Sequence, residues 1–437
     1  MRVVHVSTAD ADGGASRAAY RLHDGLRRAG HDSRMYVRNK STNDDAVQRF
    51  VPAKDRSTFI FRNARRLWLE RSLNRYAKTS SDDRTYFSDD RTCFEKEAAV
   101  QIPESDLLHL HWVAGFLDYG AFFRWLPKEM PVVWTLHDMA NFTGGCCYDM
   151  GCGKFTQQCG ACPQLGSKKE GDLTREVWRR KQKYYAALDP SRFHIVTPSR
   201  WLGEEVRRSS LLSRFDRSVI PYGLDTEVFQ PRNRGVAREV LGIPQDARVA
   251  LFVSYEIHTQ RKGFALLMEA LAGIEAAGRM FLLSLGSGPA PEIQPLPSAH
   301  VPSLGDDRLL SWVYSAADVF VLPSLADNLP NTMLEAMACG TPVAAFAAGG
   351  ISEAVRPGVT GLLARVGDAG ELRAAMLELL GNDAKRADMS ANCRRVALAE
   401  YGLSVQTGRY VELYTEMLGQ GAGGAGKEAP VHSAAAS

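Results

Sequence analysis

The chain has 437 residues, of which 45% are hydrophobic and 24% are charged, and its formal net charge is +3 at pH 7. This length exceeds what one ordinary hydrophobic core organises and predicts two or three domains, while so small a net charge excludes an electrostatic argument for nucleic-acid binding. No apolar run reaches the roughly 18 residues that cross a bilayer, and the N-terminus lacks the long apolar segment of a signal peptide, so we expect a cytoplasmic protein.

The first half of the chain begins with a predicted strand, a glycine loop and a helix. Val3–Ser7 is a short apolar run, and Arg17–Ala29 has helical spacing. Gly13 and Gly14 lie in the loop between them. Glycines in this position let a ligand approach the free N–H groups of a helix N-terminus, which favour oxygen-rich or anionic groups. A simple tight turn explains the two glycines equally well.

The stretch Arg56–Lys78 is rich in both basic and aromatic residues. Its aromatic residues include Phe59, Phe61, Trp68 and Tyr76. A basic helix with aromatic side chains can lie on an anionic membrane surface, whereas a solvated helix with one packed side has the same composition. The sequence therefore leaves two interpretations open, a plain surface helix or peripheral contact with the inner face of a membrane.

Two polar residues directly follow a predicted strand. Pro131–Leu136 is an apolar run, and His137 and Asp138 come next. Ligands of doubly wound sheets bind beyond the carboxyl ends of strands, although a histidine in this position more often makes a structural hydrogen bond. Further strands of the first half are predicted at Leu107–His111, Phe193–Thr197 and Ser218–Pro221, with helices at Asp172–Ala187 and Ser199–Ser209.

Five of the eight cysteines lie between Cys146 and Cys162. In a long cytosolic chain, such crowding favours metal or redox chemistry over a disulfide scaffold. The spacing of four of them suits tetrahedral Zn²⁺. Two of these four are separated by only two residues, and the glycines between the cysteines allow the tight loops that such a site needs. We expect such a closed site to shape a loop and not to catalyse; disulfide or redox pairing and free thiols are the alternatives. The predicted ligands are Cys146, Cys152, Cys159 and Cys162.

The second half of the chain repeats the strand and helix pattern of the first. A strand at Val249–Ser254 and a helix at Phe264–Ala276 flank Arg261, Lys262 and Gly263. The guanidinium can bind two oxygens of an anion, the lysine adds a point charge, and the helix N-terminus adds its dipole. This tripeptide suits a phosphate group, although a solvated charged loop has the same residues. Two such halves predict an α/β protein with two Rossmann-like domains facing each other across a cleft.

The stretch Pro323–Pro342 reads PSLADNLPNTMLEAMACGTP. It follows an apolar strand, continues into a predicted helix at Asn331–Cys339, and carries two acids, Asp327 and Glu335, with seven residues between them. This stretch resembles the E-x7-E signature of retaining glycosyltransferases of the family-four (group 1) kind, with Asp in place of the first Glu. The run TPSRWLGEEVRRS…VIPYGLDTEVFQP resembles the segment in which such enzymes cross into their second domain.

The resemblance implies the GT-B fold, a nucleotide-diphosphate sugar donor, and a role for each matching residue. Arg261 and Lys262 match the family's phosphate-binding pair, and Glu335 matches the acid that binds the ribose. Asp327 would meet the donor sugar, although its side chain is one methylene shorter than that of Glu. The residues placed at the donor are Gly13, Gly14, His137, Arg261, Lys262, Leu304, Asp327, Asn328, Leu329 and Glu335, with Asp138 on the acceptor side. Those expected to act in catalysis are His137, Arg261, Lys262, Asp327 and Glu335.

The resemblance also divides the chain. It implies an N-terminal acceptor-side domain over residues 1–228 and a nucleotide-sugar domain over residues 229–403. The cysteine-rich insert at 143–165 resembles that of an exopolysaccharide-type subgroup of these enzymes. A last helix at 404–418 would cross back to the first domain, and the Gly/Ala/Ser-rich residues 419–437 are expected to be disordered.

The sequence thus predicts a retaining glycosyltransferase that needs no cofactor for catalysis, with Zn²⁺ entering only as the structural ion of the cysteine segment. It would move a sugar from a nucleotide-diphosphate sugar to a hydroxyl of a glycan or lipid-linked acceptor in polysaccharide biosynthesis. The alternatives are a sugar-nucleotide epimerase or a phosphorylase on the same fold, and a non-catalytic protein that binds a sugar nucleotide or a metal. The substitution at Asp327 is the support for the non-catalytic alternative.

Overall fold

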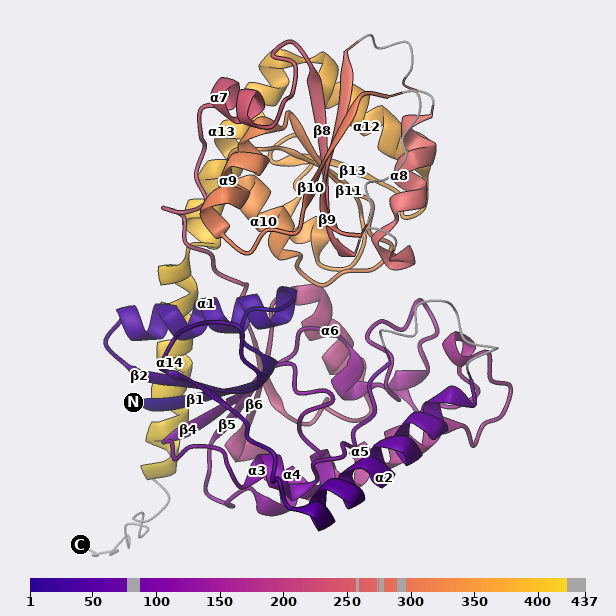
Figure 1. Ribbon diagram of the computed structural model, residues 1–437, viewed down its shortest axis with the longest axis vertical. Helices are drawn as coiled ribbons and strands as arrows, with labels where there is room; N and C mark the ends of the chain where they lie inside the picture. The colour runs from indigo at the N-terminus through magenta and orange to yellow at the C-terminus, as the bar shows by residue number, and fades with distance from the viewer. Residues whose placement is uncertain (77–86, 257–258, 273, 275–278, 289–295, 423–437) are drawn as a thin grey trace, which may run out of the picture.

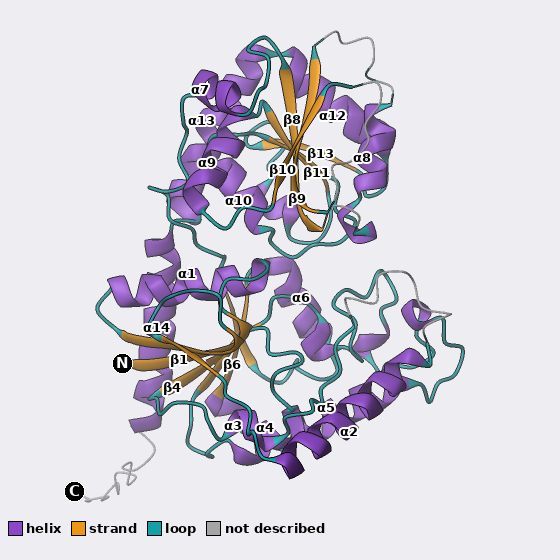
Figure 2. Ribbon diagram, in the orientation of Figure 1, coloured by secondary structure: helices purple, strands orange, loops and turns teal. Residues whose placement is uncertain are grey.

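The computed structural model describes residues 1–76, 87–256, 259–272, 274, 279–288 and 296–422. Figure 2 shows two β-sheets, one in each half of the molecule, with helices packed around both. Figure 1 shows that the first half of the chain builds one domain and the second half builds the other, with the last helix running beside both. The two Rossmann-like domains predicted from the repeated strand and helix pattern are therefore confirmed.

The N-terminal domain is built on the first of these sheets. Its central strands are short apolar runs buried along their whole length, as expected where helices cover both faces of a parallel sheet. Its strands are β1 (Arg2–Ala9), β2 (Asp32–Asn39), β3 (Val47–Arg49), β4 (Leu107–Leu110), β5 (Val132–Thr135), β6 (Phe193–Thr197) and β7 (Asp216–Val219). Its helices are α1 (Gly14–Arg28), α2 (Arg56–Asn74), α3 (Lys96–Ala99), α4 (Tyr119–Trp125), α5 (Leu173–Ala186) and α6 (Arg200–Arg208).

The C-terminal domain is built on the second sheet, and its inner strands are again fully buried. Its strands are β8 (Arg248–Glu256), β9 (Met280–Ser287), β10 (Ser298–Pro302), β11 (Val319–Leu322), β12 (Val343–Phe346) and β13 (Gly361–Ala364). Its helices are α7 (Arg234–Val240), α8 (Phe264–Leu271), α9 (Asp307–Ala316), α10 (Asn331–Ala338), α11 (Ile351–Ala354), α12 (Ala369–Gly381) and α13 (Asp383–Glu400).

Both sheets share one topology. The strand order is β3-β2-β1-β4-β5-β6-β7 in the first sheet and β10-β9-β8-β11-β12-β13 in the second. All neighbouring strands run parallel, so their carboxyl ends lie at one edge of each sheet. The order reverses between β1 and β4 and between β8 and β11, and such a switch point is where an open α/β sheet binds its ligands.

The last helix, α14 (Leu403–Ala422), returns to the N-terminal domain and packs along α1. Its Tyr410 and Tyr414 enter a core shared with Leu22 of α1 and Val3 of β1. The buried hydroxyl of Tyr414 lies 2.6 Å from Nδ1 of His109 on β4. The crossing helix implied by the family resemblance is thus confirmed. Across the described ranges, no helix is both long and apolar enough to cross a membrane.

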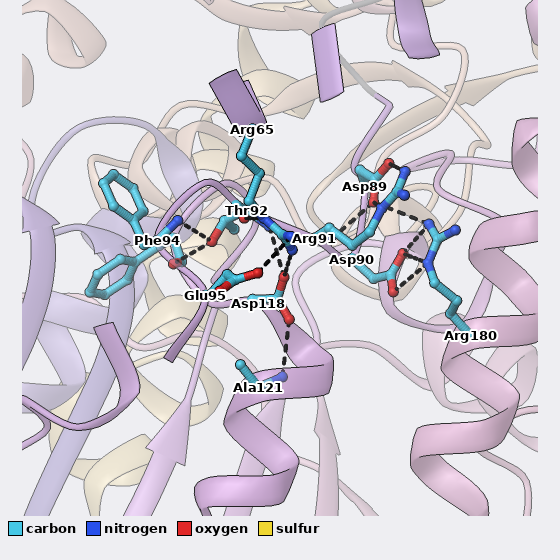
Figure 3. A network of polar contacts seen from close by, with 11 residues as sticks. Arg65, Asp89, Asp90, Arg91, Thr92, Phe94, Glu95, Asp118, Ala121 and Arg180 are labelled. Carbon is cyan, nitrogen blue, oxygen red and sulfur yellow. Dashed lines mark hydrogen bonds and ion pairs between the residues drawn. The ribbon is translucent and has the colours of Figure 1, made fainter. Parts of the chain in front are cut away.

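Helix α2 lies on the outside of the N-terminal domain and has no buried residue. Figure 3 shows how polar contacts hold it: Arg65 donates to the carboxylate of Asp118 at 3.0 Å and to the carbonyl oxygen of Thr92 at 2.7 Å. Beside this network, Arg180 of α5 binds Asp90 at 2.6 Å. Five apolar residues of α2 are more than half exposed, while Leu69 and Leu73 are partly buried; the five are Phe59, Ile60, Phe61, Leu67 and Trp68.

Several elements differ from the sequence prediction. Strand β10 lies in a proline-rich stretch for which the sequence pattern predicts no strand. Residues 419–422 extend α14 instead of being disordered, because the helix continues along the domain surface; residues 423–437 lie outside the described residues. The predicted helices at Arg56–Lys78 and Phe264–Ala276 end at Asn74 and Leu271, and the parts of these predictions at 77–78, 273 and 275–276 also lie outside the described residues.

Candidate functional site

A cavity of about 670 Å³ separates the two domains. The loops after β1 and β2 line one wall, and the ends of β8 and β9 with the loop after β10 line the other, so the carboxyl edges of both sheets meet there. Gly13, Gly14, Leu304 and Glu335 all line this cavity. The structure therefore brings together residues of the glycine loop and of the acid-bearing helix that lie more than half the chain apart in sequence.

The glycine loop lies directly against the acid-bearing helix. Gly13 has a φ of +84°, a conformation that side chains rarely adopt. The carbonyl oxygen of Gly14 accepts a hydrogen bond from the Asn331 side chain at 2.8 Å, and a Cβ at Gly14 would lie 3.6 Å from the same group. Gly13 thus supplies a backbone turn that other residues rarely adopt, and Gly14 brings the glycine loop into ordinary contact with the acid-bearing helix.

Glu335 is buried and bound by two polar partners. The guanidinium of Arg21 on α1 donates to it at 2.7 Å, and the hydroxyl of Tyr314 donates at 2.8 Å. Arg21 also reaches Asp307 at 2.9 Å, while its Nη1 has no hydrogen-bond partner among the described residues. Burial lowers the pKa of Arg21, but the carboxylates of Glu335 and Asp307 more than offset this, and the net change is upward.

A second arginine on the same face of α1 completes the contact. Arg17 donates to the carbonyl oxygen of Leu304 at 3.0 Å and lies 3.5 Å from Asp307. The sequence prediction missed both arginines, although their spacing of four residues places them on one helix face. The sequence could therefore have indicated that this face of α1 is turned toward the cleft. It could not have indicated which acids of the other domain lie opposite the two arginines.

The basic pair and the first acid bind one another. Lys262 Nζ lies 2.5 Å from Asp327 Oδ2, and Arg261 Nη1 lies 3.4 Å from the same oxygen. Burial raises the pKa of Asp327, but the charges of Lys262 and Arg261 lower it more, and burial lowers the pKa of Lys262. These three side chains thus lie together in the structure, where an incoming anion would compete with Asp327 for both cations.

Gly263 makes this arrangement possible. It has a φ of +73°, and a Cβ would lie 1.9 Å from the carbonyl oxygen of Pro323. No side chain fits there without moving the backbone. The loop that carries the two cations therefore packs directly on the loop that carries Asp327.

His137 lies at the domain interface with both ring nitrogens occupied. Its Nδ1 is 2.6 Å from the hydroxyl of Tyr222, and its Nε2 is 3.2 Å from Nδ1 of His111. Its carbonyl oxygen accepts a hydrogen bond from Asn328 at 3.1 Å, which ties it to the acid-bearing loop. Burial lowers the pKa of His137 to about 3, so the ring is neutral at physiological pH.

Asp138 and Leu329 lie on either side of this contact. The Asp138 carboxylate is buried, accepts the N–H of Ala140 at 2.8 Å, and is bonded by the thiol of Cys147. Burial raises the pKa of Asp138. The side chain of Leu329 is buried in the core of the C-terminal domain, so it can offer a ligand only its backbone.

Three buried histidines form a cluster that the sequence prediction left unused. His5 on β1 and His109 and His111 on or beside β4 place ring nitrogens within 4.8 Å of one another, and they are the one such group of potential metal ligands among the described residues. This cluster could hold a metal ion. In the structure most of its nitrogens bond within the protein: His5 Nδ1 lies 3.0 Å from His111 Nε2, and His109 bonds to Thr135, while His5 Nε2 has no hydrogen-bond partner among the described residues.

The predicted zinc ligands surround a separate cavity of about 20 Å³ in the N-terminal domain. All eight cysteines are free thiols, so the alternative of disulfide pairing is not realised in the structure. No three of the cysteine sulfurs lie within 4.8 Å of one another. The four predicted ligands therefore surround one space, but their sulfurs do not converge on one point. These residues are Cys146, Cys152, Cys159 and Cys162.

One residue of the cysteine segment reaches the charged site, and no sequence motif pointed to it. The Tyr148 hydroxyl lies 3.5 Å from Asp327 Oδ1, and the Arg261 guanidinium lies over the Tyr148 ring at 4.7 Å. On its other side the ring stacks on Trp201 at 6.3 Å. The insert thus contributes a wall to the site between the domains.

Comparison with known families agrees with this arrangement. The model for Glycosyltransferase Family 4 matches residues 12–228, and the model for Glycosyl transferases group 1 matches residues 247–382. Together they cover most of both domains, and the chain therefore belongs to the group 1 (family 4) glycosyltransferases, enzymes that depend on a nucleotide-sugar donor. The matches do not distinguish a cysteine-bearing exopolysaccharide subgroup, so that resemblance stays a prediction.

Curated relatives share a little under a third of their residues with this chain. It is 29% identical over 354 residues to the D-inositol 3-phosphate glycosyltransferase of Thermobispora bispora, covering 74% of this chain and 73% of the relative. It is 30% identical over 331 residues to the protein of the same name from Geodermatophilus obscurus, covering 69% and 64%.

Solved structures show the same fold. Sucrose-phosphate synthase from Thermosynechococcus elongatus matches 96% of this chain and 100% of its own with a TM-score of 0.66 at 20% identity. HepE of Anabaena, solved in complex with UDP-glucose, matches 95% of this chain and 100% of its own with a TM-score of 0.63 at 16% identity. These likenesses establish the GT-B fold.

Proposed function

We propose that the chain is a retaining glycosyltransferase that moves a sugar from a nucleotide-diphosphate sugar to a hydroxyl of a glycan or lipid-linked acceptor in polysaccharide biosynthesis. One observation carries the proposal: the interdomain cavity leads from Leu304 and the buried acid Glu335 on one side to the glycine loop at Gly13 and Gly14 on the other. Such a cavity suits a nucleoside, because one carboxylate can accept from two vicinal ribose hydroxyls.

The diphosphate and the sugar would occupy the neighbouring charged site. Arg261 and Lys262 would bind the diphosphate. Its phosphate oxygens would then replace the Asp327 carboxylate as the partner of both cations. Asp327 and the backbone of Asn328 and Leu329 would then be free to meet the sugar hydroxyls. The exchange keeps both buried cations compensated, which matters because a buried, unpaired charge is strongly destabilising.

Catalysis in this arrangement is electrostatic. Breaking the bond to the sugar adds negative charge to the diphosphate, and two cations already fixed in a buried site stabilise that charge without reorganisation. We assign the acceptor proton to the leaving phosphate on the same face of the sugar, which needs no protein nucleophile. The neutral ring of His137 would position the sugar, and Asp138 would lie on the acceptor side.

A thermal-shift screen of UDP-, GDP- and ADP-sugars tests the donor class, because a ligand that binds the folded protein raises its melting temperature. UDP-glucose is the first probe, since the structurally similar HepE was solved with it. Stabilisation by one base, followed by transfer or slow hydrolysis of that donor, is the expected result. Conversion of the donor to an isomer without an acceptor would instead identify an epimerase, and binding without any turnover would identify a non-catalytic binding protein.

The proposal includes one structural Zn²⁺ at the four clustered cysteines and a membrane-facing role for α2. The exposed aromatic residues of α2, Phe59, Phe61 and Trp68, lie on a helix that also carries several arginines. That combination suits an anionic membrane surface, where a lipid-linked acceptor would be found. Loss of vesicle binding on substitution of these aromatic residues is the expected result.

A further inference from the structure

The backbone of the cysteine segment is irregular and contains little secondary structure. Between Gly144 and Leu165 the described helices are two single turns, at Lys154–Thr156 and Pro163–Leu165. Several residues here have positive φ, including the non-glycine residues Met150 at 50° and Ala161 at 43°. Such conformations cost on the order of 1–3 kcal/mol each and persist where something else holds the chain.

The four thiols lie around one small space, although no three of their sulfurs are within 4.8 Å of one another. They line a cavity of about 20 Å³, about the space that a single water-sized sphere needs. The N–H of Gly144 donates to Cys159 Sγ at 3.1 Å, and the N–H groups of Gln164 and Leu165 donate to the sulfur of Cys162. Backbone N–H groups aimed at sulfur are suitable donors to a metal-bound cysteine.

A buried cation lies near two of the cysteines. Lys181 on α5 is almost fully buried and donates to the carbonyl oxygens of Ala140 at 2.5 Å and Thr143 at 3.1 Å. It lies close enough to Cys159 and Cys146 to interact with their charges. Zn²⁺ bound to four thiolates carries a net charge of −2, and a buried ammonium beside it would offset part of that charge.

Hydrogen bonds also fix the backbone around Tyr148, which belongs to this segment. The carbonyl oxygen of Tyr148 accepts the side-chain N–H of Gln164 at 2.7 Å, and Gln164 follows Cys162 by two residues. The carbonyl oxygen of Cys147 accepts the N–H of Met139 at 2.9 Å, next to the strand end that carries His137. The side chain of Tyr148 is buried between the domains, against Arg261 and Asp327.

We propose that Cys146, Cys152, Cys159 and Cys162 bind one Zn²⁺, and that this ion fixes Tyr148 as a positioning residue for Arg261 at the donor diphosphate. Closing the sulfurs onto the ion forms four Zn–S bonds of about 2.3 Å and releases up to four thiol protons. The ring of Tyr148 then restricts the guanidinium to the direction of the phosphates, while its hydroxyl meets Asp327. The role of Tyr148 rests on the proposed sugar-transfer reaction, whereas zinc binding by the four cysteines does not depend on that reaction.

Metal content tests the zinc site. Full-length protein purified under reducing conditions should hold one zinc per chain after dialysis, and Cys159→Ser should lose it. Cys93→Ser is the matched control, because Cys93 is a free thiol outside the segment and should leave the zinc unchanged. Less than half an equivalent in the wild-type protein, or full retention in Cys159→Ser, would overturn the site.

Donor kinetics test the role of Tyr148, using the sugar nucleotide that stabilises the wild-type protein most in the UDP, GDP and ADP series. Tyr148→Ala should raise the donor KM about tenfold, the order expected for losing a buried cation–π contact. Tyr148→Phe keeps the ring over Arg261 and should recover most of that loss. Cys159→Ser should raise KM as Tyr148→Ala does, and the double variant should be no worse than either, because both changes remove one interaction.

The outcomes separate the inference from the proposed function. Additive losses in the double variant, or no rescue by Tyr148→Phe, would refute the positioning role while the enzyme still turns over. A wild-type protein that holds one zinc but neither binds nor consumes any sugar nucleotide would refute the proposed function and the role of Tyr148, and would leave the zinc site confirmed. Normal donor KM in zinc-free protein would refute the link between the two.

Discussion

The ion pair between Arg21 and Glu335 is the contact whose loss should cost this protein most. Arg21 belongs to the N-terminal domain and Glu335 to the C-terminal domain, and their side chains are 9% and 3% exposed. Replacing Arg21 with Met keeps most of the side-chain volume and removes the charge. The Glu335 carboxylate would then keep its bond to Tyr314 but lose its cation.

The size of the effect follows from that burial. Leaving one member of a buried ion pair behind costs about 3–5 kcal/mol. For a domain of this size, each kcal/mol lowers the melting temperature by roughly 2–4 °C, so Arg21→Met should melt roughly 6–20 °C below wild type. Adding Glu335→Gln should recover most of the loss, because no uncompensated charge remains in the double variant.

Thermal unfolding of the ligand-free protein measures this difference. Arg27→Met is the matched control on the same helix, because Arg27 pairs with Asp44 at 2.8 Å but is 45% exposed. Exposed pairs contribute about 1 kcal/mol or less, so the control should shift by no more than a few degrees. If Arg21→Met melted no lower than Arg27→Met, the domains would be open in solution and the reasoning from burial would be wrong.

Three further predictions concern the charged site and α2. Lys262→Ala should lower kcat/KM by a factor of about 10²–10³, whereas Lys385→Ala, far from the cavity, should leave steady-state kinetics unchanged. The pKa of Asp327 is lower in the folded protein than in the unfolded chain, so its carboxylate stabilises the fold above the unfolded pKa, and this contribution is lost as pH falls through the folded pKa. The difference in melting temperature between wild type and Asp327→Asn should therefore shrink between about pH 5 and pH 3. A difference that stays constant over this range would contradict the assignment. Trp68→Ser should weaken sedimentation with anionic vesicles at low salt, whereas Val240→Ser, at a still more exposed residue of the other domain, should not; equal binding by both variants would refute the membrane surface.

Much of the fold could be predicted because its signals are local. Each strand, loop and helix is a short continuous segment, and parallel strands place their carboxyl ends at one edge of a sheet. The stretch around Asp327 and Glu335, and the basic pair beside Gly263, implied a donor site only through their resemblance to the family's motifs, because their spacing alone would be unremarkable. Strand β10 was missed because its flanking prolines obscured the pattern, and the end of α14 was missed because glycine and alanine composition carries no packing information.

The pairings inside the cleft depend on tertiary structure alone. Arg21 and Glu335 lie 314 residues apart in sequence, and Tyr148 and Asp327 lie 179 apart. No periodicity or spacing links such residues, because a side chain's partner is decided by how two separately folded domains meet. The sequence by itself determined which chemical groups this enzyme carries and at which strand ends. Only the packing of the domains decided which cation lies beside which acid, because a charge that is buried between the domains needs an opposite charge next to it.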